Sequence, residues 1–165
     1  MHSEDFFSGF RGFERDHGAS LTDEFNRLAI SRNWKVGGRR YRKNRVECFA
    51  SEFDHLYRTD GSKIAGWQRL CSDVGITPCP STITGCKKVS GSVSLSGLAL
   101  TFLQALKTVC VNIYDLVDAR ASGTKVKLFP SKAALRRYSI NENKIFPKKA
   151  AKEDGFLHGV LIHMF

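Results

Sequence analysis

The sequence predicts a mainly α fold: a single compact helical domain over residues 1–165, with five to six helices and at most a minor short strand. Three observations predict it. Most apolar residues recur at the three- and four-residue spacing of amphipathic helices. Residues that favour helix caps stand where these segments begin and end. An apolar content of 42% in 165 residues also suits one domain with a substantial core.

The first segment is rich in aromatic residues, with Phe6, Phe7, Phe10 and Phe13 near helical spacing. We expect it to dock onto the core; a free peptide that binds a partner is the alternative. The segment has no apolar core run, so no secretory signal is expected. No transmembrane segment is expected either, because the longest weakly polar run, 93–106, is shorter than the ~20 apolar residues that span a bilayer.

Three helices are predicted next. The first begins after Ser20, an N-cap residue with Asp23 three positions on, which together resemble a capping box. The second covers 39–57 and follows a pair of glycines that break the chain. The third covers 63–74, and Gly75 ends it with a left-handed cap.

The second half continues the helical pattern around one strand. Ser81 is the predicted N-cap of a further helix, and Gly123 ends a long helix. The alternation in 125–129 predicts a short half-exposed strand. Ser131 caps a small helix, and Pro147 is placed to start the last one. Large side chains of these segments are expected to be buried together: Trp34, Phe49, Phe53, Trp67, Leu70, Ile113 and Leu157.

The cysteines predict buried, reduced thiols. Their odd number and irregular spacing do not form a disulfide framework, and no Cys-x-x-Cys pair indicates structural zinc. Cys48, Cys71, Cys86 and Cys110 fall on apolar helix faces, where a thiol packs as a small hydrophobe. Reduced thiols favour a location in the cytoplasm or nucleus.

Residues 89–104 interrupt a helical pattern. If they are removed, Lys88 joins Ala105, and the apolar positions around the junction are spaced 3, 4, 3, 4 and 3 residues apart. That spacing predicts one amphipathic helix that runs from Ser81 through Ile113. The positions so aligned are Ile83, Cys86, Leu106, Val109, Ile113 and Leu116.

Three interpretations of residues 89–104 remain open. In the first interpretation the segment is an N-terminal extension of the later helix, because Leu95, Leu98 and Phe102 are in phase with that helix. Alternatively, it is a surface insertion, which folds generally tolerate. The third is a retained intron translated in frame, because Val89-Ser90 can be encoded by a splice-donor sequence and Gln104 by an acceptor.

Several short sequence segments together resemble those of a family of small, largely uncharacterised proteins of filamentous fungi. The segments are EFNRLA, GWQRLCSDVGITPCPSTITGCKK, VNIYDLVDAR, LRRY and KIFPKKAAKEDGFLHGVL. They lie between about Phe6 and the end of the chain. The resemblance implies that the helix after the Cys-Lys-Lys motif continues directly into the Val-Asn-Ile motif, so that 89–104 is an insertion. It implies no activity and no catalytic residue.

Positive charge is concentrated in two zones. The chain has 26 Lys and Arg against 16 Asp and Glu, a formal charge of +10. Residues 31–50 carry +6 and residues 125–152 carry +8, so the rest of the chain sums to −4. Such an excess favours an acidic partner: nucleic acid, anionic lipid or an acidic protein.

The first zone supplies the candidate site. Trp34 and Tyr41 interleave with its cations and would suit base stacking, which makes a nucleic-acid interface over residues 32–45 one interpretation. A solvated helix face or a docking site for an acidic protein is favoured, because no recognised nucleic-acid motif is present. The residues predicted to contact the partner are Arg39, Arg40, Arg42 and Lys43.

Two other residue pairs are candidates for metal binding or catalysis. Asp115 and Asp118 share a helix face, but without a third ligand nearby we expect salt bridges to the basic zones. Cys48 and His55 are expected to be a core cysteine and a surface histidine. No metal or cofactor is predicted. The sequence therefore favours a non-catalytic, basic intracellular interaction module, ahead of a nucleic-acid binder and of an enzyme with an unrecognised site.

Overall fold

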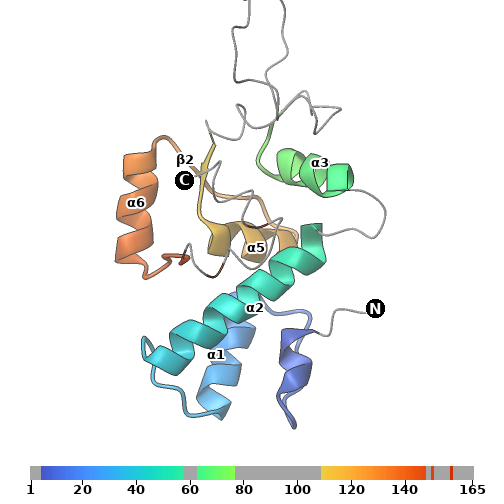
Figure 1. Cartoon of the computed structure of the whole chain (residues 1–165), viewed down its shortest axis with the longest axis vertical. Helices are drawn as coiled ribbons and strands as arrows, with labels where there is room; N and C mark the ends of the chain where they lie inside the picture. The colour runs from blue at the N-terminus through green and yellow to red at the C-terminus, as the bar shows by residue number, and fades with distance from the viewer. Residues whose placement is uncertain (1–4, 58–62, 77–108, 148–149, 151–156, 158–165) are drawn as a thin grey trace, which may run out of the picture.

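The structure, a computed structural model, describes residues 5–57, 63–76, 109–147, 150 and 157 (Figure 1). The mainly α prediction is confirmed: the described part contains five α-helices, one 3-10 helix and a two-stranded sheet. In chain order the elements are η1 (Phe6–Gly9), α1 (Leu21–Ser31), α2 (Arg39–Tyr57), α3 (Lys63–Asp73), β1 (Cys110–Val111), α5 (Ile113–Ser122), β2 (Leu128–Phe129) and α6 (Lys132–Asn141).

The predicted caps form in the structure. The Ser20 hydroxyl accepts a hydrogen bond from the Asp23 amide at 3.1 Å and donates one to the Asp23 carboxylate at 2.7 Å. Ser131 accepts from the amide three residues on, which caps α6. Gly75 and Gly123 follow α3 and α5 with φ angles of 74° and 68°. Residues other than glycine rarely adopt this conformation, so both helices end where the sequence predicts.

Helix α2 is the centre of the domain and packs against η1, α1, α3 and α5 (Figure 1). Five of the seven predicted core residues are buried in one cluster: Phe49, Phe53, Leu70, Ile113 and Leu157. The predicted burial of Trp34 and Trp67 is wrong, because both are only half-buried at the edge of this cluster. An indole ring is large enough that it seldom loses all contact with water.

The segment before α5 also corrects the sequence prediction. A helix was expected to run through Val109 and Ile113, but Cys110–Val111 is extended and pairs with Leu128–Phe129 in an antiparallel ladder. Helix α5 starts only at Ile113, because the Asn112 side chain accepts a hydrogen bond from the Tyr114 amide and acts as its N-cap. The predicted strand in 125–129 is confirmed in its last two residues.

The aromatic N-terminal segment docks onto the core, as predicted. Phe7 is buried and stacks on Phe13 with their ring centroids 5.7 Å apart. Two arginines cover the outer rings: Arg27 of α1 lies 4.3 Å above Phe13, and Arg32, which follows α1, lies 5.7 Å above Phe10. The segment is therefore part of the domain and not a free binding peptide.

Other predictions fall outside the described residues. They are the helix after Ser81, the segment 89–104 and the helix after Pro147, of which Leu157 is described and buried. Within the described part of the chain, no helix is long and apolar enough to cross a bilayer.

A variant that joins Lys88 directly to Ala105 is expected to be at least as stable and soluble as the full chain. Helix α5 has its own N-cap at Asn112 and directly follows β1, which pairs with β2, so we do not expect its start to depend on residues 89–104. The deletion also removes a charge-free apolar stretch, which lowers the tendency to aggregate. Thermal unfolding and soluble yield provide the measurement.

A second variant, with 89–104 replaced by a Gly/Ser linker of equal length, separates the effect of sequence from that of chain length. Loss of cooperative unfolding in both variants would show that residues 89–104 are a structural element of the domain.

Candidate functional site

The four predicted contact residues lie on the first turns of α2. Arg39, Arg40, Arg42 and Lys43 are all exposed, and we call them the α2 basic face. The preceding turn fixes their position. Gly37 has a φ of 74°, and a side chain at the next residue, also a glycine, would place its Cβ 2.9 Å from a carbonyl oxygen.

The positive charge of the α2 basic face is unfavourable at its position on the helix dipole. Peptide dipoles leave a partial positive charge at a helix N-terminus, where acidic residues are stabilising and basic ones are not. The first turn of α2 has no acidic residue and contains Arg39, Arg40 and Arg42. Each misplaced cation costs roughly 0.3–1 kcal/mol at an exposed site. Helix stability therefore does not explain the cluster, whereas a bound anion would favour it.

The α2 basic face is also largely unpaired within the described structure. Lys43 approaches Glu47 at 3.6 Å, but this pair is highly exposed and contributes little. The three arginines form no ion pair with any described residue. Their guanidinium groups are hydrated and available to carboxylates, which they bind in a bidentate geometry.

Many other cations in the described ranges have structural partners. Arg15 bridges Glu52 at 3.2 Å, and Arg120 bridges Asp73 at 3.0 Å. Arg45 lies 4.4 Å above the ring of Tyr114 and donates to the Asn143 carbonyl. Other engaged cations are Arg27, Arg32, Arg69 and Lys144, and Lys127 lies over the ring of Tyr138. This division separates cations that hold the fold from those that face water.

The two candidate stacking residues do not reach the α2 basic face. Tyr41 is buried, its hydroxyl donates to Asn26 at 2.8 Å, and its ring meets Phe25 edge-on at 5.2 Å. Trp34 is half-buried between Phe10 and Phe25, with ring centroids 5.6 and 6.0 Å away. Both rings face the core because hydrophobic burial outweighs exposure for a large aromatic side chain.

The paired aspartates hold elements together. Asp115 forms an ion pair with Lys144 at 2.6 Å, which confirms a salt bridge to the second basic zone. Asp118 accepts hydrogen bonds from the Thr22 amide and hydroxyl at 3.3 and 2.9 Å. It thus ties α5 to the N-terminus of α1.

The Cys48 and His55 prediction is confirmed. Cys48 is fully buried and His55 is exposed. Burial raises the pKa of the Cys48 thiol well above its usual range, so it is not a nucleophile at neutral pH. Cys71 and Cys110 are also buried, as predicted, and are not in disulfides, while Cys86 lies outside the described residues. Within the described residues no cluster of His, Cys, Asp and Glu could hold a metal ion.

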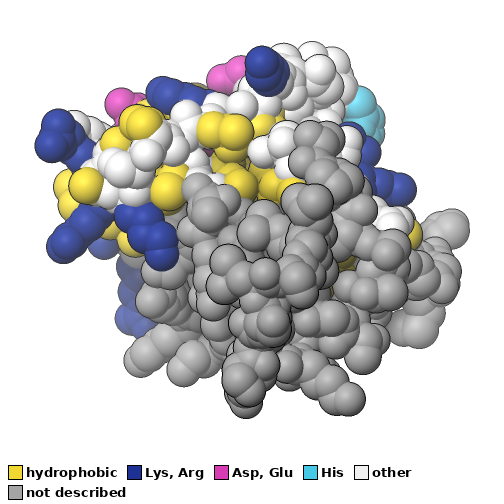
Figure 2. Space-filling model, turned by 90° about the horizontal axis from the view of Figure 1, so that it is seen from above, with side chains coloured by type: hydrophobic (Ala, Val, Ile, Leu, Met, Phe, Trp, Pro, Cys, Tyr) yellow, Lys and Arg dark blue, Asp and Glu magenta, His cyan; other side chains and the backbone are white. Residues whose placement is uncertain are grey.

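Lys and Arg side chains of the second basic zone surround apolar surface near α6. Figure 2 views the molecule from above and shows this arrangement on the side where α6 lies. Arg45 connects the two basic zones, because its hydrogen bond to Asn143 brings α2 against the loop after α6.

Sequence reasoning noted the charge of both zones but missed that α6 borders a pocket. The available signal was the four-residue spacing of Leu135 with Ser139 and of Arg136 with Ile140.

No known protein guides the assignment of this site. In comparisons with known proteins, the chain matches no protein-family model, no curated protein and no solved structure. The resemblance to small proteins of filamentous fungi therefore stays a prediction.

Proposed function

We propose that the protein is a non-catalytic intracellular interaction module that docks an acidic protein partner on the α2 basic face. The observation that carries the proposal is the set of three exposed arginines in the first turn of α2, where the helix dipole opposes them. Carboxylates from a partner would pair with these guanidinium groups and also interact favourably with the positive end of the helix. Cys48, Cys71 and Cys110 are buried and not in disulfides, which supports a reducing location, in the cytoplasm or nucleus.

The environment of the aromatic residues favours protein over nucleic acid. Sequence-tolerant nucleic-acid binding combines a basic groove with aromatic faces on which bases stack. Tyr41 is buried and Trp34 packs between two phenylalanines, so neither offers an open ring face beside the cations. Nucleic acid is the second candidate, favoured by the contact that joins the two basic zones at Asn143. Such binding would rest on phosphate contacts alone.

Replacing Arg39, Arg40, Arg42 and Lys43 together with Ala is expected to weaken binding of a Glu-rich peptide roughly fourfold or more, since each lost pair contributes about 0.2–1 kcal/mol. The fold should persist, because all four residues are exposed and Ala favours the helix. Fluorescence anisotropy of a labelled Glu-rich peptide measures the affinity, and circular dichroism checks helicity.

The matched control replaces four exposed cations outside α2 with Ala: Arg11, Lys125, Lys127 and Arg137. Both variants lower the net charge by the same amount, so equal weakening in the two would reduce the effect to bulk charge and contradict the proposal. Duplex DNA serves as competitor. If an equal concentration of DNA displaces the peptide completely, nucleic acid becomes the favoured partner.

A further inference from the structure

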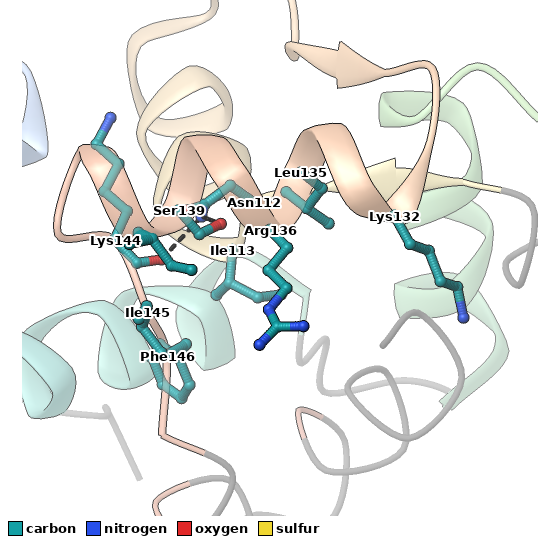
Figure 3. A pocket seen from close by; sticks show the side chains of 10 residues that line it. Asn112, Ile113, Lys132, Leu135, Arg136, Ser139, Lys144, Ile145 and Phe146 are labelled. Carbon is teal, nitrogen blue, oxygen red and sulfur yellow. Dashed lines mark hydrogen bonds between the residues drawn. The ribbon is translucent and has the colours of Figure 1, made fainter.

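A second surface feature lies on α6, away from the α2 basic face. A pocket of about 430 Å³ is bounded by α6, the start of α5 and residues 144–146 (Figure 3). Its volume lies within the roughly 300–1,000 Å³ typical of small-molecule sites. Apolar side chains dominate the lining: Ile113, Leu135, Ile140, Ile145 and Phe146.

The polar groups in the pocket wall already satisfy one another. The Asn112 side-chain amide donates to the Ser139 hydroxyl at 2.9 Å and to the Lys144 carbonyl at 2.8 Å, and its oxygen accepts from the Tyr114 amide. The Lys144 ammonium group points away from the pocket towards Asp115 (Figure 3). A ligand segment in this part of the pocket therefore needs no polar partner, which favours an apolar chain.

The rim of the pocket is positively charged. Lys132 and Arg136 are one turn apart on α6, and their side chains leave the helix on the side that Ile113 and Phe146 occupy (Figure 3). Both are exposed and form no ion pair with a described residue. Two neighbouring cations beside an apolar wall match a ligand with one anionic end and one apolar tail.

Exposed apolar side chains extend the pocket wall. Ile140 is 53% exposed and Ile145 is 61% exposed, and both line the pocket. Leaving such side chains in water is unfavourable in proportion to their apolar area, so a tail that covers them gains binding free energy. The volume is larger than a single peptide anchor residue needs, which favours a small amphiphile over the side chain of a docked protein.

We propose that this α6 pocket binds a small amphiphilic carboxylate, with the carboxylate on Arg136 and Lys132 and the alkyl tail against Ile113, Ile145 and Phe146. The site is separate from the α2 basic face, so the proposal stands or fails independently of the partner proposed for that face.

The test is calorimetric titration of the full chain with dodecanoate below its micelle-forming concentration. We expect saturable binding of dodecanoate, and much weaker binding of dodecanol and of dodecyltrimethylammonium, which lack the negative charge. Arg136→Gln should weaken dodecanoate binding about tenfold, because a hydrogen bond to a charged group is lost. Arg137→Gln is the matched control, since Arg137 is the exposed neighbour on α6 that does not line the pocket.

A second variant addresses the tail. Ile145→Ser should weaken dodecanoate binding without unfolding the domain, because Ile145 is mostly exposed. Three results would overturn the proposal: no saturable dodecanoate binding, dodecanol binding as tightly as dodecanoate, or equal affinities of the Arg136→Gln and Arg137→Gln variants. Binding of a Glu-rich peptide at this pocket in place of dodecanoate would also overturn it and indicate a protein ligand.

Discussion

Replacing Asn112 with Ala is expected to lower the free energy of unfolding by about 3 kcal/mol, a large part of the ~5–15 kcal/mol that stabilises a typical domain. Asn112 is 3% exposed and lies between β1 and α5. Its side chain contacts three separate parts of the chain. It caps α5 through the Tyr114 amide, reaches α6 through Ser139, and reaches the loop after α6 through the Lys144 carbonyl.

The size of this effect follows from what the truncation leaves behind. Loss of a helix N-cap alone costs about 1 kcal/mol. The part-buried Lys144 carbonyl would also lose its donor, and a buried polar group left unpaired costs about 1–3 kcal/mol. Urea denaturation should show a lower midpoint with an unchanged slope, since the surface exposed on unfolding hardly changes.

Asn44→Ala is the matched control. The Asn44 amide donates to one helix carbonyl at an exposed position, so the same substitution should change stability by less than about 0.5 kcal/mol. If the two variants unfold at the same urea concentration, the Asn112 amide does not join α5 to α6 in solution.

The sequence predicts the ends of the helices well because caps are local. Ser20 needs only the amide of Asp23, three residues on. Gly75 and Gly123 need only a left-handed backbone at one position. These interactions are encoded within a few residues of each other, so pattern reasoning finds them without knowledge of the tertiary structure.

The start of α5 could not be predicted in the same way. The apolar spacing that runs from Val109 to Leu116 is compatible with a helix, yet Cys110–Val111 is extended. That conformation depends on a ladder with Leu128–Phe129, which lies on the far side of α5 in the sequence. Long-range pairing overrides local periodicity here, as it commonly does in strands.

In the candidate site, too, local spacing predicts some side-chain positions while tertiary packing decides others. Helical spacing predicts that Arg39, Arg42 and Lys43 face water together, and the structure exposes them. The neighbouring Tyr41 was a candidate for stacking, but it lies seven residues before Cys48 and shares the buried face of α2. Whether an aromatic ring among cations is exposed depends on what packs against it, and the packing partner, Phe25, comes from another helix.

Glu24→Ala is the second substitution with a large expected effect, a loss of about 2 kcal/mol in the free energy of unfolding at neutral pH. Glu24 is 2% exposed, and its carboxylate accepts hydrogen bonds from the Asp16 amide at 2.8 Å and from Arg27 at 2.7 and 2.9 Å. Arg27 in turn donates to the Glu14 carbonyl. The carboxylate therefore anchors residues 14–16, which follow the docked aromatic segment. Hydrogen bonds to a charged group contribute about 1.5–3 kcal/mol, and Arg27 is half-exposed, so water can replace the carboxylate as the partner of its guanidinium group.

The charge of Glu24 makes this contribution depend on pH. The Arg27 hydrogen bonds lower the pKa of the Glu24 carboxyl, although burial acts in the opposite direction. Because the pKa is lower in the folded state than in the unfolded state, the stabilisation is fully present above the unfolded value. It is lost as the pH falls through the folded value. Wild-type stability should therefore decrease in acid partly through this residue.

Glu24→Gln isolates the charge, since glutamine has the same shape and never ionises. At neutral pH the Gln variant should be less stable than the wild type, and the difference should shrink once acid protonates Glu24 in the wild type. Urea titrations of both proteins across this pH range measure the convergence. Glu47→Gln, which removes the exposed pair with Lys43, should give a small difference throughout. A Glu24→Gln penalty that stays constant into acid would mean that Glu24 stabilises the fold through packing and neutral hydrogen bonds, and not through its charge.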